Sequence, residues 1–341
     1  MTKKSLDLKN ITIKDIAKKA NVGVSTVSRV LNSSAPVSKQ TKKKVLMAIE
    51  QMNYIPNEMA RGLVKRNSKS IAFMIPEIQN PFYPEILQSI EEVTSKHGFS
   101  LSIYITNQDP NKEKYYLDEM YARRMSGVII ICTSIQDKEF IKKVQQRMEI
   151  LSIHADIDDV DYIDTDSRKG TREIVNYLIS LGHTKIGFIG YRFNITALNN
   201  RLMGYMDALK EHNIPVNPEY IIEGLALENP GYNTAKRLLQ LKDRPTAIHC
   251  FNEYVACGAY AAIKEAKLRI PEDISITGYD NLKITGLLSP SLTTVAQPIA
   301  TMGRIASEML IKNILGRSVH IKQSIMLPTE LIIRDSACSP K

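Results

Sequence analysis

Residues 12–32 read TIKDIAKKANVGVSTVSRVLN, and this stretch predicts two short helices joined by a tight turn. Apolar side chains recur at helical spacing through residues 13–20 and again through residues 24–31. The break between the two segments contains Gly23, which suits a tight turn. Two short helices joined in this way form a helix-turn-helix, whose second helix reads the major groove of DNA.

Local signals support both helices. The first is expected to begin at Thr12, because Asp15 completes a capping-box-like pair with it. The second projects four polar side chains away from its apolar stripe: Ser25, Thr26, Ser28 and Arg29. Small hydroxyls and an arginine suit contacts to phosphates and base edges. An arbitrary small helical bundle is the alternative that the pattern alone leaves open.

A third helix is expected from about Ser38, which can cap it. Its outer face is predicted to carry the lysines Lys39, Lys42, Lys43 and Lys44. Its inner face is predicted to carry Val45, Leu46 and Ile49. These three helices together form a basic, all-α head.

The positive charge of the chain is concentrated in this head. The 341 residues have a formal net charge of +9. Residues 1–70 hold 15 Lys and Arg against 4 Asp and Glu, a net of +11, whereas residues 71–341 hold 30 against 32, a net of −2. Such an asymmetry indicates a polyanionic partner such as nucleic acid, the alternative being a solvated lysine-rich tail.

Composition excludes several classes of protein. A hydrophobic content of 43% argues against bulk disorder, and no apolar run approaches the roughly 20 residues of a membrane span. The opening MTKKSLDLKN lacks the apolar segment of a secretory signal. The cysteines are scattered and form no CxxC pair: Cys132, Cys250, Cys257 and Cys338. We therefore expect reduced thiols, no metal site and a cytoplasmic, nucleoid-associated location without membrane contact.

The remainder of the chain alternates strand-like and helix-like segments. Short β-rich runs such as SIAFMIP (residues 70–76) and SGVIIICTS (126–134) are separated by amphipathic stretches such as PEILQSIEEVTSKHG (84–98). This alternation predicts βαβ units and parallel sheets. A second series of strands includes KIGFIGY (185–191) and ISITGYD (274–280), which indicates a second lobe of the same type.

Catalytic motifs are not found in the sequence. It contains no Walker P-loop, GxSxG, HExxH or glycine-rich dinucleotide turn. His183 lies at an expected helix-to-strand connection, where a capping role is favoured over catalysis. We therefore expect neither an enzyme nor a cofactor.

Three segments of the head resemble one known family. TIKDIAKKANVGVSTVSRVLN, VSKQTKKKVLMAIEQMNYIPN and MARGL are similar, in order and spacing, to the DNA-binding head of the LacI–GalR family of bacterial transcription regulators. Segments of the body extend the resemblance to about residues 11–335, among them LGHTKIGFIG (181–190) and PTAIHCFNE (245–253). The resemblance implies a helix-turn-helix head followed by an α/β domain like periplasmic binding proteins, with two lobes and two doubly wound parallel sheets.

The resemblance also assigns DNA contacts. Val24 and Ser25 begin the helix that reads base edges, and Arg29 lies in the same region. Other positions match backbone-phosphate contacts: Thr12, Thr26, Ser28, Asn32 and Tyr54. Gly23 departs from the family's usual serine, which costs one hydroxyl contact.

Residues 57–65, NEMARGLVK, resemble the family's hinge helix, which folds on operator DNA and enters the minor groove. Leu63 matches the apolar wedge that bends the duplex. Its expected neighbours at the DNA are Asn57, Ala60 and Arg61. A helix this short with Gly62 inside it is marginal alone, which is a physical reason for folding only on DNA.

Polar and aromatic residues that follow the expected strands are candidates for an effector site, because ligands of α/β sheets bind at the carboxyl ends of strands. The candidates are Asn80, Phe82, Tyr83, His154, Asp166, Arg201, Asn252, Asp280 and Gln297. The resemblance supports all of these except His154 and Asp166. It also exposes two departures from sugar-binding relatives: His154-Ala155 replaces an Asp-Arg pair, and no tryptophan platform precedes Gly231. Buried structural roles remain the alternative for each candidate.

The resemblance implies a repressor that binds a palindromic operator as a homodimer and responds to a small-molecule effector, expected to be a sugar or sugar derivative. A purine-like ligand, a phosphoprotein corepressor and a plain solute-binding module are the alternatives. The expected domains are a head (1–58), a hinge helix and linker (59–70) and an effector-binding and dimerisation domain (71–341). Within the last, the first lobe comprises residues 71–167 and 297–327, and the second residues 168–296 and 328–341.

Overall fold

The computed structural model of the chain describes residues 11–32, 35–54, 68–131, 135, 137–191, 196–224, 230–316 and 321–341. The chain divides into two compact units, Met1–Ser68 and Lys69–Lys341. We call these two units the head and the body, and each is described by itself.

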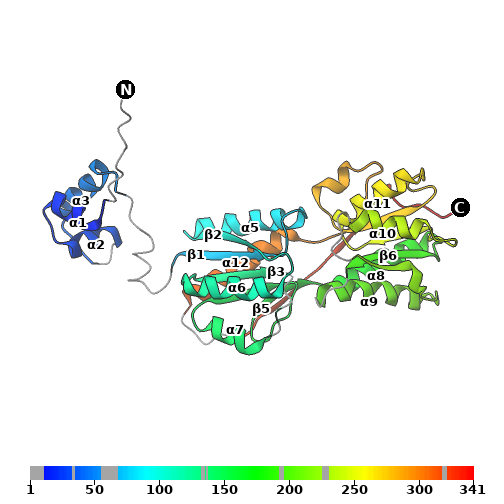
Figure 1. Cartoon of the computed structure of the whole chain (residues 1–341), viewed down its shortest axis with the longest axis horizontal. Helices are drawn as coiled ribbons and strands as arrows, with labels where there is room; N and C mark the ends of the chain where they lie inside the picture. The colour runs from blue at the N-terminus through cyan, green and yellow to red at the C-terminus, as the bar shows by residue number, and fades with distance from the viewer. Residues whose placement is uncertain are drawn as a thin grey trace, which may run out of the picture. The chain divides into compact units, whose positions relative to one another are not determined.

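The helices of the head are α1 (Ile13–Ala20), α2 (Val24–Asn32) and α3 (Lys39–Gln51) (Figure 1). The backbone amide and the hydroxyl of Thr12 donate to the Asp15 carboxylate over 2.8 and 2.7 Å, which confirms the pair predicted at the start of α1. Asn21, in the left-handed region at a φ of 50°, ends α1 just before the turn into α2. The head is therefore the predicted helix-turn-helix followed by a third helix.

The core of the head takes one fully buried residue from each helix, Ile16, Val27 and Val45. The lysines predicted on the outer face of α3 are all exposed. Leu46 is 48% exposed, so its prediction as an inward residue was wrong. A rotation of about 100° per residue places Ala48 and Ile49, rather than Leu46, on the face of Val45.

The first sheet of the body has the strand order β11-β5-β4-β3-β1-β2, and all of its pairs are parallel. Its strands are β1 (Ser70–Ile75), β2 (Ser100–Ile105), β3 (Gly127–Ile131), β4 (Glu149–Ile153), β5 (Asp161–Thr165) and β11 (Ser324–Leu327). One face packs against α5 (Phe82–Lys96) and α12 (Ile299–Leu315), and the other against α6 (Pro110–Ala122) and α7 (Lys138–Gln145) (Figure 1). We call this three-layer unit the N-lobe.

The second sheet has the order β12-β10-β9-β8-β6-β7, and only the β10–β12 pair is antiparallel. Its strands are β6 (Ile186–Tyr191), β7 (Ile221–Gly224), β8 (Ala247–Cys250), β9 (Ser275–Asp280), β10 (Thr293–Ala296) and β12 (Glu330–Ile332). The covering helices are α8 (Ser167–Ser180) with α9 (Thr196–Glu211), and α10 (Pro230–Leu239) with α11 (Glu253–Glu265). Short 3-10 helices occur at η1 (Pro218–Tyr220) and η2 (Lys283–Leu287). This second three-layer unit is the C-lobe.

The chain passes between the two lobes three times. Asp166 connects β5 to α8, residues 297–298 connect β10 to α12, and residues 328–329 connect β11 to β12. Thr165 and Gln297, which belong to different crossovers, share a hydrogen bond of 2.8 Å. Residues near the crossovers therefore lie where the strand ends of both lobes meet.

The two α/β lobes with parallel sheets are confirmed, but the sequence pattern missed four strands. Three of these, β7, β11 and β12, lie at sheet edges, where one side of the strand is unpaired and a continuous apolar run is not required. The fourth, β5, is interior but reads DYIDT, and its carboxylates at Asp161 and Asp164 hide it from an apolar-run search.

Candidate functional site

The helix α2 presents its predicted reading residues away from the core of the head. Val24, the first residue of α2, is 41% exposed although it is apolar. Ser25 and Arg29 are also exposed, while Thr26 and Ser28 are half-buried. An exposed polar surface beside one unburied valine suits a helix that reads base edges in a groove.

The remaining predicted DNA contacts have different surroundings. The Thr12 hydroxyl donates to Asp15, so a phosphate contact through this hydroxyl would have to compete for the same proton. Tyr54 is half-buried against the apolar core of the head, and Asn32 is the last residue of α2. The predicted hinge residues Asn57, Ala60, Arg61 and Leu63 lie outside the described residues.

In the body, Arg201 is the only one of the candidate effector residues that carries a fixed positive charge. It is 4% exposed and projects from α9. Its guanidinium lies over the rings of Phe251 and Tyr279, with centroids at 4.6 and 3.8 Å. Nη1 donates to the Phe251 carbonyl over 2.6 Å, and Nη2 lies 3.6 Å from Oδ1 of Asp280. Two aromatic faces and one carboxylate therefore hold this cation in place.

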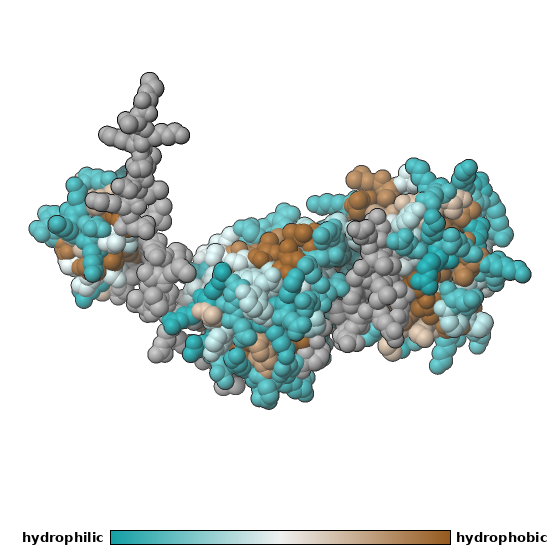
Figure 2. All heavy atoms as spheres, in the orientation of Figure 1, coloured by the Kyte–Doolittle hydropathy of each residue, from teal (hydrophilic) through white to brown (hydrophobic). Residues whose placement is uncertain are grey.

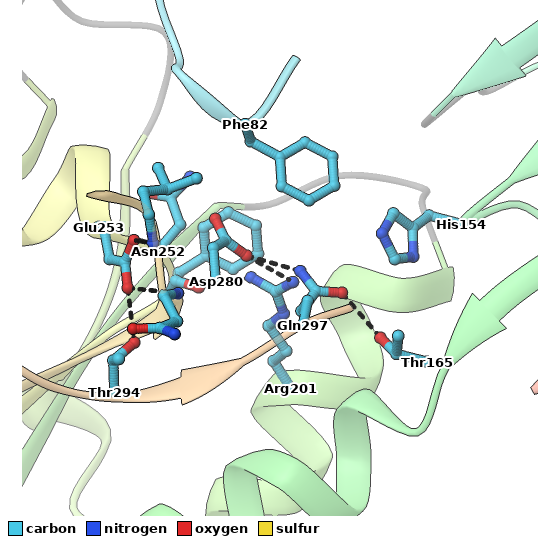
Figure 3. A network of polar contacts seen from close by, with 12 residues as sticks. Phe82, His154, Thr165, Arg201, Asn252, Glu253, Asp280, Thr294 and Gln297 are labelled. Atoms are coloured by element: carbon cyan, nitrogen blue, oxygen red, sulfur yellow. Dashed lines mark hydrogen bonds and ion pairs between the residues drawn. The ribbon is translucent and has the colours of Figure 1, made fainter. Parts of the chain in front are cut away.

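Asp280 is the carboxylate at the end of β9, and it is 3% exposed. Gln297 donates from Nε2 to Oδ1 of Asp280 over 2.6 Å and accepts at Oε1 from the Thr165 hydroxyl (Figure 3). Burial raises the pKa of Asp280 to about 6, although the Arg201 guanidinium and the Gln297 hydrogen bond oppose that rise. This series of contacts, Thr165–Gln297–Asp280–Arg201, thus runs from the end of β5 in the N-lobe to α9 in the C-lobe.

Glu253 supports the loop that follows Asp280. Its carboxylate accepts from the backbone amide of Asn281 over 2.6 Å, from the amide of Leu282, and from the Thr294 hydroxyl over 2.7 Å. Glu253 is fully buried, and burial together with the negative charge of Asp280 raises its pKa to about 8. Glu253 was not among the predicted effector residues.

The N-lobe contributes aromatic side chains next to this group. Phe82, at the start of α5, is 5% exposed, and its ring meets that of Tyr83 in an edge-on contact at 5.5 Å. Asn80 is buried, and its Oδ1 accepts from the Phe82 backbone amide over 3.0 Å. Asn80 therefore fixes the turn that presents Phe82.

His154 directly follows β4 and is 3% exposed. Its Nδ1 lies 2.6 Å from Oδ1 of Asp164, and its ring lies 5.9 Å from that of Phe82. A positive charge on this ring would lower the pKa of Asp280, so the two groups lie in one electrostatic environment. Figure 3 shows His154 and Phe82 pointing toward the region of Gln297, Asp280 and Arg201.

Two candidates act as helix caps in the structure. Asn252 is buried, and its Oδ1 accepts from the Val255 backbone amide at the start of α11 over 2.9 Å. Asp166 is exposed, and its Oδ1 accepts from the Lys169 amide at the start of α8 over 2.9 Å. Asn252 still lies beside the group in Figure 3, next to Glu253.

The structure therefore brings together Phe82, His154, Arg201, Asp280 and Gln297, with Asn80, Tyr83 and Asn252 supporting their positions. Sequence reasoning missed Asp164, Thr165 and Tyr279, all of which touch members of this group. No sequence signal pointed to Asp164, because the strand that carries it, β5, was itself missed.

His183, which was considered for catalysis in the sequence, has a structural role. His183 connects three segments of the C-lobe through Thr246, Ser275 and the Cys338 carbonyl, at 2.8 to 3.1 Å. Within the described ranges, no group of three or more His, Cys, Asp or Glu residues is arranged to hold a metal ion. In the same part of the chain, no helix is long and apolar enough to cross a membrane.

Comparison with known proteins gives matches over nearly the whole chain. Residues 12–57 match the family model "Bacterial regulatory proteins, lacI family", and residues 175–337 match "Periplasmic binding protein-like domain". The HTH-type transcriptional repressor PurR of Aliivibrio salmonicida is 34% identical over 328 residues, which cover 95% of this chain and 98% of that protein.

Solved structures of bacterial regulators are also similar to this chain. The lac repressor dimer bound to operator and the anti-inducer ONPF superimposes with a TM-score of 0.83 at 28% identity, covering 97% of this chain and 100% of that one. A LacI family transcriptional regulator from Enterococcus faecium with bound ribose has a TM-score of 0.72 at 27% identity, covering 80% of this chain and 100% of that one.

Proposed function

The chain belongs to the LacI family of bacterial regulatory proteins, and we propose that its head and its body perform the two halves of one repressor function. It is a DNA-binding transcriptional repressor under the control of a small-molecule effector, and it acts on operator DNA as a homodimer. The observation that carries this conclusion is that one relative, itself a repressor, matches both head and body over 95% of the chain.

We propose that α2 reads the operator through Val24, Ser25 and Arg29, which are exposed at the surface of the head. The half-buried Thr26, Ser28 and Tyr54, together with Thr12 and Asn32, are proposed to contact backbone phosphates. Asn57, Ala60, Arg61 and Leu63 are proposed to act at the minor groove, Leu63 as the wedge. The net charge of +11 on residues 1–70 supplies general affinity for the duplex.

The effector is proposed to bind at the group formed by Phe82, His154, Arg201, Asp280 and Gln297. Asn80, Tyr83 and Asn252 belong to the proposed site as supporting residues, and Asp166 belongs to it at the crossover that follows Thr165. A buried guanidinium, a carboxylate, an amide and an aromatic face suit a small polar ligand.

A sugar or sugar derivative is the proposed effector, and it is supported by the ribose in the Enterococcus faecium relative. A purine-like ligand and a phosphoprotein corepressor remain the alternatives. We further propose that the protein acts in the cytoplasm by binding alone, without catalysis. Incubation with candidate sugars followed by chromatography tests the last point, because recovery of the unchanged sugar is expected.

The homodimer gives two heads to one palindromic operator, because a single helix-turn-helix reads only a half-site. The visible face of the body is largely hydrophilic, with hydrophobic areas around α5 and around η2 (Figure 2). In η2, Ile284 is 41% and Leu287 is 83% exposed. Exposed apolar groups of this kind support a protein contact at this part of the body.

We propose that residues 1–58 form the DNA-binding domain, residues 59–70 the hinge helix and linker, and residues 71–341 the effector-binding and dimerisation domain. Residues 71–167 with 297–327 are assigned to one lobe, and residues 168–296 with 328–341 to the other. Effector binding between strand ends of both lobes would change their orientation and so the spacing of the two heads. Coupling of this kind typically corresponds to about 1–3 kcal/mol and is reciprocal.

Operator selection tests the proposal directly. The full-length protein is incubated with genomic fragments, and the retained fragments are sequenced and re-measured by gel shift at two salt concentrations. A shared palindrome, bound in preference to unrelated DNA at both salt concentrations, is the expected result. Binding that is salt-sensitive and indifferent to sequence would contradict a repressor.

A further inference from the structure

A buried histidine in the C-lobe has no role in the function proposed above. His249 lies on β8, an interior strand of the second sheet, and is fully buried. It pairs with Phe188 on β6 and with Thr277 on β9. Its ring lies 5.8 Å from the ring of Phe188, and its Nδ1 lies 3.0 Å from the hydroxyl oxygen of Thr277. Neighbours on both adjacent strands therefore fix the position of this ring.

His249 and Arg201 occupy the same layer, between the sheet and α9. Thr277 and Tyr279 are two positions apart on β9, so their side chains point to the same face of the sheet. The Thr277 hydroxyl contacts His249, and the Tyr279 ring lies under the guanidinium of Arg201. Phe188 and Tyr279 also belong to one apolar cluster with residues of α9. The imidazole and the guanidinium are therefore neighbours in the interior of the C-lobe.

Each of these two side chains has one nitrogen without a hydrogen-bond partner among the described residues. These atoms are Nε of Arg201 and Nε2 of His249, and both are buried. The other guanidinium nitrogens are engaged, because Nη1 donates to the Phe251 carbonyl and Nη2 faces Asp280. Leaving a buried polar atom unpaired costs on the order of 1–3 kcal/mol. Nε is therefore the part of the guanidinium that still requires an acceptor.

His249 can supply this acceptor. Its complete burial, together with the positive charge of Arg201, lowers the pKa of His249 to about 3, so the ring is neutral near neutral pH. A neutral imidazole has one N–H and one acceptor nitrogen. The Thr277 hydroxyl can accept from Nδ1, and a cation in the same layer favours a lone pair, rather than a proton, on Nε2. An unpaired donor and an unpaired acceptor are thus present in one buried layer.

We infer that His249 is a positioning residue of the effector site, because its Nε2 accepts the hydrogen bond of Arg201 Nε through one buried water molecule. The two nitrogens are not bonded to each other directly, and a bridging water satisfies both at once. His249 acts through Arg201 and does not touch the effector. With Nε and Nη1 held, Nη2 is the nitrogen presented to Asp280 and the effector. This role rests on the proposed function, since it concerns the same site.

Nitrogen-15 NMR of the full-length protein, labelled in its histidines, is the first test. We expect His249 to carry its proton on Nδ1 and to have an unprotonated Nε2 at neutral pH. A proton on Nε2 would overturn the inference, because that atom could then accept nothing from Arg201. The signal of His249 is identified by its loss in His249→Gln. This measurement on the unmodified protein stands even where a variant fails to fold.

The second test measures hydrogen exchange at Nε of Arg201 in arginine-labelled full-length protein, with the signal identified by its loss in Arg201→Lys. His249→Asn can keep the contact to Thr277 but has no atom at the place of Nε2, so exchange should become about tenfold faster. His249→Gln places an amide oxygen near Nε2 and should restore slow exchange. His212→Asn, which alters an exposed histidine just after α9, is the matched control and should change nothing.

Each other outcome contradicts the role of His249. Exchange that stays slow in His249→Asn would show that Nε2 is not the acceptor. Equally fast exchange in the Asn and Gln variants, with unchanged melting temperatures, would show that ring packing and not the acceptor holds Arg201. Either result would leave operator binding untouched, whereas failure of the unmodified protein to select an operator would contradict the proposed function itself.

Discussion

Nε2 of Gln297 donates to Oδ1 of Asp280 over 2.6 Å, and this bond ties the second crossover between the lobes to the carboxyl end of β9. The same amide accepts from Thr165 at the end of β5. One side chain therefore touches both lobes and the carboxylate proposed to hold the effector. A ligand that engages Asp280 would compete with, or add to, a hydrogen-bonded contact that joins the two lobes.

Arg201→Ala should abolish the effector response while sparing operator binding in the absence of effector. The guanidinium holds Asp280 and packs between two rings, but it lies in the body and not in the head. Fluorescence anisotropy with labelled operator, with and without effector, is the measurement. Unaltered induction in this variant would show that the site has been placed wrongly. Thermal unfolding of the variant provides the control for folding.

Glu253 should make the stability of the body depend on pH. Its pKa is raised from 4.5 to about 8 in the folded protein, so the unfolded chain releases this proton at lower pH than the folded one. The free energy of unfolding should therefore fall as pH rises from about 4.5 to about 8, by on the order of 1 kcal/mol or more from this group.

Glu253→Gln removes this titration and provides the comparison. The difference in unfolding free energy between the original protein and Glu253→Gln, measured by urea denaturation from pH 5 to 8.5, should shift against the original protein as pH rises. A difference that stays constant over this range would mean that the carboxylate is already ionised in the folded state, held by its three donors.

Gly204→Ala should destabilise the C-lobe. A Cβ at this position would collide with the backbone carbonyl oxygen of Arg168, so α8 and α9 would have to separate. Overpacking of this kind costs about 1–3 kcal/mol, which thermal unfolding can detect. Gly286→Ala is the matched control, because nothing lies within 4 Å of a Cβ there, and its effect should stay within about 0.5 kcal/mol.

Leu63→Ala should weaken operator binding at least about tenfold while changing non-specific binding little, because the bending of a particular sequence carries specificity. Binding isotherms with operator and with random DNA at one salt concentration give both values. Leu315→Ala alters a leucine that is 66% exposed on α12 and should leave both unchanged. Equal losses on operator and random DNA in Leu63→Ala would remove the wedge role.

Local sequence patterns were sufficient to predict much of this protein's secondary structure. The helical spacing in residues 12–32 predicts the helix-turn-helix, and the Thr12–Asp15 pair marks where its first helix begins, because both depend on neighbours within four residues. The alternation of apolar runs and amphipathic segments likewise predicts parallel sheets covered by helices. Leu46 shows where such reasoning fails, since one residue of helical rotation separates an inward from an outward side chain.

The chemistry of the site depended on tertiary structure. Asp164 lies on β5 and His154, ten positions earlier, directly follows β4, so only the pairing of β4 with β5 brings them to 2.6 Å. Thr165 and Gln297 are 132 positions apart and meet only because the chain returns through a second crossover. The sequence alone determined most of the elements and the location of the positive charge, because these follow from local spacing and composition, and its motifs were enough to indicate the family. Which donors face which acceptors was decided by packing between segments that are distant along the chain.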